Sequence, residues 1–303
     1  MKKVLLIYNP NAGNGVIKNH LDEIIGSFAE SEIFIVPYRL GGFIDIEKLM
    51  EELPEDEFDL LIAAGGDGTV NLVVNSMLRH DVKIPLAIFP AGTANDLARH
   101  LGIPLTIEGM IKTALSDEVI QVDIGKAGDR FFVNVLAIGM LVDISQKTDP
   151  MIKNTFGLGA YYLRSLAEIP FARANKLRIT SKECTLLEDV SAVLVLNGRG
   201  AGGFKDLVPM SEVSDGLLDV LVVRKLILPV MLPALLTVLM GNHLEDKRFE
   251  YFRTDRLRIE PVKKGEVVNT DVDGEKGDPL PLDIEVLPGR LMLKANRSGS
   301  FTP

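Results

Sequence analysis

The chain has 303 residues, 47% of them hydrophobic and 25% charged, which suits one large domain or two ordinary ones. Its net charge of −9 argues against a generic nucleic-acid-binding protein, because such proteins need a basic surface. The single cysteine excludes an intramolecular disulfide and a cysteine-rich zinc site. This composition is that of an ordinary globular protein.

The apolar segments of the sequence are too short or too interrupted to cross a membrane. The first, Val4–Tyr8, could imitate a secretory leader, but an Asn-Pro pair ends it at once. The longest, Leu226–Met240, is shorter than the roughly 20 residues of a spanning helix and contains Pro229 and Pro233. We therefore expect a cytoplasmic protein. Leu226–Met240 is apolar around most of its circumference, which fits either a buried helix or a surface that touches lipid.

Strand and helix patterns alternate along the first 100 residues. Apolar runs predict strands at Val4–Tyr8, Ile33–Val36, Leu60–Ala64 and Leu86–Phe89. Helical spacing lies between them, at Ile17–Phe28, Ile44–Leu53, Val70–Leu78 and Asn95–Leu101. Continuously apolar strands that alternate with helices indicate a parallel sheet covered on both faces, which is a three-layer α/β domain.

From near Val122 the sequence becomes rich in strand patterns, many of which alternate apolar and polar residues as half-exposed antiparallel strands do. The predicted strands are Phe131–Ala137, Lys176–Thr180, Ala192–Leu196, Leu217–Val223, Arg256–Glu260, Val267–Val272 and Leu282–Val286, with helices around Gly159–Glu168 and Val230–Met240. We expect an α/β domain over residues 1–125, which residues 288–303 could complete. An antiparallel β-sandwich domain over residues 126–287 follows it.

Three glycine-containing loops follow predicted strands in the first half of the chain: Asn9–Gly15, Gly65–Asn71 and Pro90–Asp96. Open parallel sheets bind ligands at the carboxyl ends of their strands, where these loops fall. Glycine lets the backbone approach a phosphate, and the following helix offers free N–H groups with a partial positive charge. One such loop is often only a turn, but three in the same relative position predict a phosphate site. The sequence lacks a G-x-x-x-x-G-K-[ST] loop.

These motifs resemble the catalytic domain of the diacylglycerol kinase family, which includes sphingosine kinases, ceramide kinases, bacterial diacylglycerol kinases and related bacterial lipid kinases. The resemblance rests on G-G-D-G-T at 65–69, with N-P-x-A-G before it and P-A-G-T-A-N-D after it. G-G-D-G loops also occur in NAD kinases and 6-phosphofructokinases, but P-A-G-T-A-N-D at this distance favours the lipid kinases. The second half adds Gly198–Phe204, Asp215–Asp219 and Asp273-Gly274-Glu275, so the resemblance covers nearly the whole chain.

The resemblance implies an α/β domain like that of 6-phosphofructokinase and NAD kinase, followed by the β-sandwich. It also implies a set of ATP-binding residues: Asn9, Pro10, Asn11, Ala12, Gly13, Arg39, Gly65, Gly66, Asp67, Gly68, Thr69, Val70, Asn71, Gly92, Thr93 and Asn95. Arg39 departs from the pattern, since the family usually has a hydroxyl residue near this position.

Catalytic and metal-binding residues are implied in the same way. Glu275 is the first choice for the base that takes the proton of the lipid hydroxyl, and Asp273 is the second. Asp67 should act near the catalytic magnesium and the phosphates. A further Mg²⁺ site carries over to Asp215, with the backbone carbonyls of Glu212 and Leu217. Without the resemblance, the acids around residue 273 would read as an ordinary acidic hairpin.

The resulting hypothesis is an ATP- and Mg²⁺-dependent lipid kinase that converts diacylglycerol to phosphatidic acid. Sphingoid bases, ceramide, monoacylglycerol and phosphatidylglycerol are alternative acceptors, because no motif reads the headgroup. An NAD-kinase-like enzyme and a non-catalytic nucleotide-binding regulator are further alternatives. The expected partners are ATP and a lipid met at the membrane surface, with no nucleic acid. A homodimer is compatible with the sequence, which carries no signal for oligomeric state.

Overall fold

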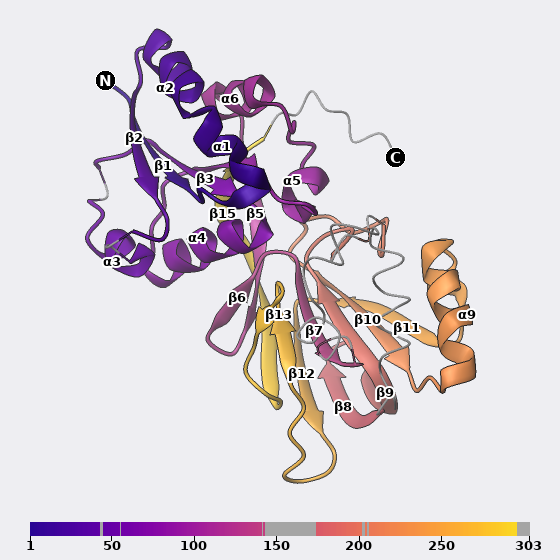
Figure 1. Ribbon diagram of the computed structural model, residues 1–303. Coiled ribbons are helices and arrows are strands. Elements are labelled where there is room, and N and C mark those ends of the chain that lie inside the picture. Colours follow the sequence, from indigo (N-terminus) through magenta and orange to yellow (C-terminus); the bar gives the residue numbers. More distant parts are fainter. Residues whose placement is uncertain are drawn as a thin grey trace. The chain divides into compact units, whose positions relative to one another are not determined.

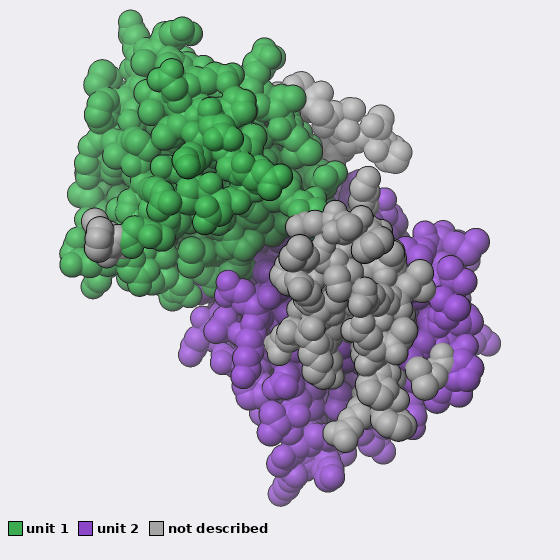
Figure 2. Space-filling view, viewed as in Figure 1, with its two compact units in different colours: residues 1–123, 289–303 green, residues 124–288 purple. Residues whose placement is uncertain are grey.

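The computed structural model describes residues 1–42, 45–54, 56–140, 142, 174–201, 204 and 206–295. The chain forms two compact units (Figures 1 and 2). Unit 1 comprises Met1–Asp123 and Gly289–Pro303, and unit 2 comprises Ile124–Pro288. The predicted helix at Gly159–Glu168 lies outside the described residues.

Unit 1 is built on a parallel sheet with the order β2-β1-β3-β4-β15. Its strands are β1 (Lys3–Tyr8), β2 (Phe34–Arg39), β3 (Leu60–Gly65), β4 (Leu86–Pro90) and the end of β15 (Leu282–Lys294). The first residues of β5 (Val119–Ala127) also belong to unit 1. Nearly every residue of β1, β3 and β4 is buried, as expected for strands with helices on both faces.

Helices cover both faces of this sheet (Figure 1). The side chains of α1 (Val16–Asn19), α2 (Leu21–Glu30) and α6 (Ile107–Leu115) share one buried cluster with alternate residues of β1, β3 and β4. On the other side, α4 (Asp67–Arg79) contacts β3 and packs against α3 (Ile46–Glu51). The short α5 is Asp96–His100. The three-layer α/β architecture predicted from the sequence is confirmed.

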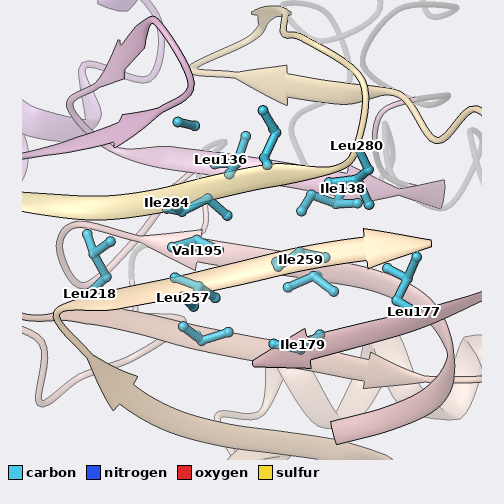
Figure 3. Close-up of a cluster of buried hydrophobic side chains, with 14 of the residues drawn as sticks. Leu136, Ile138, Leu177, Ile179, Val195, Leu218, Leu257, Ile259, Leu280 and Ile284 are labelled. Atoms are coloured by element: carbon cyan, nitrogen blue, oxygen red, sulfur yellow. The ribbon is translucent and has the colours of Figure 1, made fainter. Parts of the chain in front are cut away.

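Unit 2 is antiparallel throughout its described strands. Its main sheet path runs β14-β13-β7-β9-β8-β12-β15, while β10 pairs with β9 and β11, and β5 with β6. The bounds are β6 Arg130–Phe132, β7 Val135–Gly139, β8 Asn175–Ser181, β9 Thr185–Leu196, β10 Leu218–Arg224, β11 Phe249–Thr254, β12 Arg256–Pro261, β13 Thr270–Val272 and β14 Glu275–Lys276. Alternate side chains from these strands meet in one apolar core (Figure 3). The predicted β-sandwich is confirmed.

Several boundaries differ from the sequence-based prediction. Phe131–Ala137 is two strands rather than one, because residues 133 and 134 leave the ladder between β6 and β7. Ile17–Phe28 divides into two helices at His20, whose ring nitrogen contacts the Val16 carbonyl. Helix α6 and strands β5 and β11 were not predicted. The predicted helix at Val230–Met240 is α9 (Leu228–Leu239), which a short 3₁₀ turn at His243–Glu245 follows.

Candidate active site

Strand register brings the ends of four strands of unit 1 to one edge of the sheet. Tyr8, the last residue of β1, is opposite Arg39 of β2 and Ala64 of β3. Gly65 of β3 is opposite Pro90 of β4. The three predicted phosphate loops leave the sheet directly after these positions, so all three begin at the same edge.

Two glycines set how closely the three loops approach one another. A Cβ on Gly13 would lie 2.4 Å from the carbonyl oxygen of Ala91, so only glycine fits where the first loop meets the third. A Cβ on Gly92 would lie 2.6 Å from the Cα of Gly66, where the second and third loops meet. The loops therefore form one contiguous backbone surface. Gly68, at the start of α4, has open space around its Cα and is exposed.

Asp67 ties the second loop to the third. Its Oδ2 accepts a hydrogen bond from the Asn95 backbone N–H at 2.8 Å, and its Oδ1 accepts one from Asp96 at 2.7 Å. Asn95 adopts the left-handed conformation, with φ of 50°. Its side chain bonds both the N–H and the carbonyl of Gly92 at 2.8 Å. Asp67 and Asn95 thus fix the shape of the P-A-G-T-A-N-D loop, a role that the motif alone does not reveal.

The remaining predicted nucleotide residues divide by exposure. Thr69, Val70 and Asn71 are buried in the first turn of α4, and the Thr69 Oγ1 receives a weak hydrogen bond from Asn9 Nδ2 at 3.4 Å. Asn11, Thr93 and Arg39 are exposed. The Arg39 guanidinium has a long contact of 3.5 Å from its Nη1 to the Leu40 carbonyl. Because the first N–H groups of α4 have no helical acceptor, this surface suits an anion.

The acidic turn of unit 2 is a tight hairpin between β13 and β14. Asp273 and Gly274 at its tip both have positive φ, 51° and 91°, as an Asp-Gly two-residue turn requires. The Asp273 carboxylate accepts three backbone N–H groups, from Val133 at 2.6 Å, Asn134 at 3.0 Å and Val135 at 2.8 Å. These bonds fasten the hairpin to the segment between β6 and β7. They span about 140 residues of sequence, and no local pattern signals them.

Glu275 differs from its neighbours in this hairpin. Its side chain is 56% exposed and forms an ion pair of 3.8 Å with Arg130. Asp271 is buried, and its Oδ1 accepts the Gly274 N–H at 2.7 Å. Glu275 is therefore the carboxylate of this turn that is accessible to a substrate, whereas Asp273 and Asp271 hold the backbone. Arg130 was not identified from the sequence.

The predicted metal residue Asp215 lies in a second acidic cluster of unit 2. Its Oδ1 accepts the Leu217 N–H at 3.0 Å, and its Oδ2 forms an ion pair with Arg253. Asp219 is fully buried and accepts a 2.5 Å hydrogen bond from the Tyr251 hydroxyl. Burial raises the pKa of Asp219, while the hydroxyls of Ser211 and Tyr251 act in the opposite direction.

The predicted metal ligands at Asp215 are few, and all of them are oxygen atoms. Glu212 lies in the same loop and is exposed, and the family resemblance implies that its backbone carbonyl and that of Leu217 are the other ligands. Within the described ranges, no group of three or more His, Cys, Asp or Glu side chains is arranged to hold a metal ion. One carboxylate with backbone carbonyls still fits Mg²⁺, which binds hard oxygen ligands and retains several waters. A metal ion here would have to share Asp215 with the Arg253 guanidinium.

Comparisons with known proteins agree across the whole chain. Residues 3–127 match the model of the diacylglycerol kinase catalytic domain, and residues 134–295 match the YegS C-terminal NAD kinase beta sandwich-like domain. A diacylglycerol kinase from Bacillus subtilis is 32% identical over 286 residues, covering 93% of this chain and 92% of that protein. One from Staphylococcus epidermidis is 30% identical, covering 92% and 88%. A crystal structure of a diacylglycerol kinase from Bacillus anthracis aligns with a TM-score of 0.78 at 29% identity, covering 99% of each chain.

Proposed function

Because this chain belongs to the diacylglycerol kinase family and is a lipid kinase, we propose that it transfers the γ-phosphate of ATP to diacylglycerol, giving phosphatidic acid. The main support for ATP binding is that three glycine-containing loops meet at one edge of the unit 1 sheet. Family membership favours this reaction over an NAD-kinase-like activity or a non-catalytic regulator.

In this proposal ATP binds to unit 1 along the three loops. The phosphates lie against Asn9–Gly13 and Gly65–Asn71, where α4 begins, and Gly92 and Thr93 complete the contact. Asp67 and Asn95 act by holding the loops in register through the bonds described above. Arg39, at the end of β2, is an exposed cation that can contact a phosphate or the adenine.

Unit 2 supplies the base. Glu275 accepts the proton of the lipid hydroxyl as that oxygen forms its bond to the γ-phosphorus, while the bond to the β–γ bridging oxygen breaks and ADP leaves. We assign this role to Glu275 rather than Asp273, because both oxygens of Asp273 are occupied by backbone N–H groups. Asp273 is then a positioning residue that fixes the turn carrying Glu275.

Mg²⁺ is the proposed cofactor. Asp215, with the carbonyls of Glu212 and Leu217, would hold one ion, and Asp67 would lie near the ion that accompanies ATP. When bound, the metal neutralises charge on the phosphates. The chain's own residues do the rest: the loops orient ATP, and Glu275 removes the proton.

We further propose that unit 1 is the nucleotide-binding domain and unit 2 the lipid-substrate domain of a peripheral enzyme. Among the described residues, no helix combines the length and apolar character needed to cross a bilayer. Such a protein meets its lipid at the membrane surface.

The test is transfer of labelled phosphate from ATP to a lipid panel by purified protein, with and without Mg²⁺. The panel contains diacylglycerol, monoacylglycerol, ceramide, a sphingoid base and phosphatidylglycerol. We expect Mg²⁺-dependent labelling that is fastest with diacylglycerol. Faster labelling of another lipid would reassign the acceptor but keep the site. Absence of transfer to every lipid would refute the proposal.

A further inference from the structure

Helix α9 buries one side and exposes the other. Met231 and Ala234 pack in a buried cluster of unit 2, together with residues of β9, β10 and β11. Leu232, Leu236, Leu239 and Met240, on the opposite side, are 50%, 48%, 50% and 73% exposed. They are spaced i, i+4, i+7 and i+8, which places them on one face of a helix. We call these four residues the α9 stripe.

The α9 stripe has no charged neighbour within its own helix. The sequence of α9 contains no acidic or basic residue, and its one polar side chain is Thr237. The Thr237 hydroxyl donates to the Pro233 carbonyl at 2.8 Å and accepts from Arg248 Nη2 at 2.8 Å, so it is fully engaged. The helix therefore offers solvent a purely apolar face, which marks an interaction surface.

Charged residues of both signs flank α9 in sequence. Lys225 precedes α9 and Lys247 follows it, and both are exposed. Arg248 lies beside Thr237 and is neutralised by Asp246, whose pKa the guanidinium lowers to about 2. Exposed Glu245 and its neighbour Asp246 lie between α9 and Lys247, so these flanking charges do not form a basic patch. Any attachment here therefore depends on the apolar residues of the helix.

We propose that the α9 stripe inserts into the lipid surface that holds the substrate, and so docks the enzyme on the membrane. This inference rests on the proposed function, because a lipid kinase must meet a substrate that resides in a bilayer. A bilayer interface accepts an apolar helix face lying in its plane and needs no shape complementarity. Binding driven in this way should change by less than about two-fold with salt, unlike binding by a basic patch.

A direct test uses the absence of tryptophan from the chain, which makes an introduced indole a site-specific probe. Leu236→Trp places it in the α9 stripe, and Leu187→Trp places it at a position of β9 that is similarly exposed, at 52%. With vesicles of phosphatidylcholine, phosphatidylglycerol and diacylglycerol, we expect a blue shift and quenching by brominated acyl chains for Leu236→Trp alone. An indole at position 236 that stays open to acrylamide in the presence of vesicles would overturn the proposal.

A second test removes the apolar face without adding charge. Leu236→Gln/Leu239→Gln keeps helix propensity and should weaken vesicle binding about ten-fold or more, with Leu187→Gln as the matched control. Phosphorylation of a dispersed short-chain diacylglycerol should be unchanged, which shows that the variant is folded. If light scattering shows that the wild type is a dimer and the variant a monomer, a second copy covers the stripe and the proposal fails.

The two tests separate this inference from the proposed function. If the indole of Leu236→Trp is not quenched although the protein phosphorylates lipid, docking by α9 is refuted and the kinase assignment stays intact. Normal quenching, with no phosphorylation of any lipid, refutes the assigned reaction and leaves the docking surface.

Discussion

Replacing Asp273 with asparagine tests whether this carboxylate holds the turn between β13 and β14. Asparagine tolerates the positive φ of 51° at this position, so the backbone conformation is preserved. Its single oxygen can keep the N–H groups of Asn134 and Val135, but its amide N–H₂ then faces the N–H of Val133, a residue that is 1% exposed. An unsatisfied buried N–H and the loss of charge from the other two bonds together cost about 3 kcal/mol.

Amide hydrogen exchange of residues 133–135 measures this cost where it arises. Local opening that is easier by about 3 kcal/mol speeds exchange more than a hundred-fold. Glu275→Gln is the matched control, because it lies in the same hairpin but its carboxylate is exposed and accepts no backbone N–H in the described contacts. Equal protection in Asp273→Asn and in the wild type would refute the structural role, and Asp273 would return as a candidate base.

Three further predictions concern the site itself. Glu275→Gln should lower kcat by about 10²- to 10⁴-fold while leaving the KM for ATP nearly unchanged, as rate measurements would show; wild-type kcat in the variant would exclude Glu275 as the base. Gly92→Ala places a Cβ 2.6 Å from the Cα of Gly66, so the KM for ATP should rise at least about ten-fold; the control Gly26→Ala adds a Cβ with no atom within 4 Å. Saturating Mg²⁺ should stabilise the wild-type fold by about 2–3 kcal/mol and so raise its Tm. Asp215→Asn should abolish most of this rise in Tm, and an undiminished rise would place the ion elsewhere.

The features that the sequence predicted well are those that local physics determines. Buried β-strands at Leu60–Gly65 and Leu86–Pro90 are continuous apolar runs, and the glycine loops follow them directly. Since parallel strands align their carboxyl ends, the meeting of the loops could be expected from the order of strands and helices alone. Helix α6 also had a readable signal, namely apolar residues at helical spacing after an N-cap at Thr106, but the sequence-based prediction did not use it.

The features that the sequence did not predict depend on contacts between distant residues. Nothing near Asp273 indicates that its oxygens meet the N–H groups of residues 133–135, and nothing near Asp215 indicates Arg253. Such partners are set by strand pairing across the sandwich rather than by local pattern. For the same reason, Asp273 and Glu275 could not be distinguished by sequence, whereas their different exposure and hydrogen bonding separate them.

The division of β15 between the two units has a consequence for how the chain folds as it is synthesised. Leu282–Ile284 pair with β12 in unit 2, whereas Leu293 pairs with Leu86 of β4 in unit 1. Leu291 and Leu293 are buried there, and Gly289 donates a 2.7 Å hydrogen bond to Asp123. Until the ribosome releases these residues, β4 has an open edge. We therefore expect unit 1, although encoded first, to reach its final stability only after the sandwich has been translated.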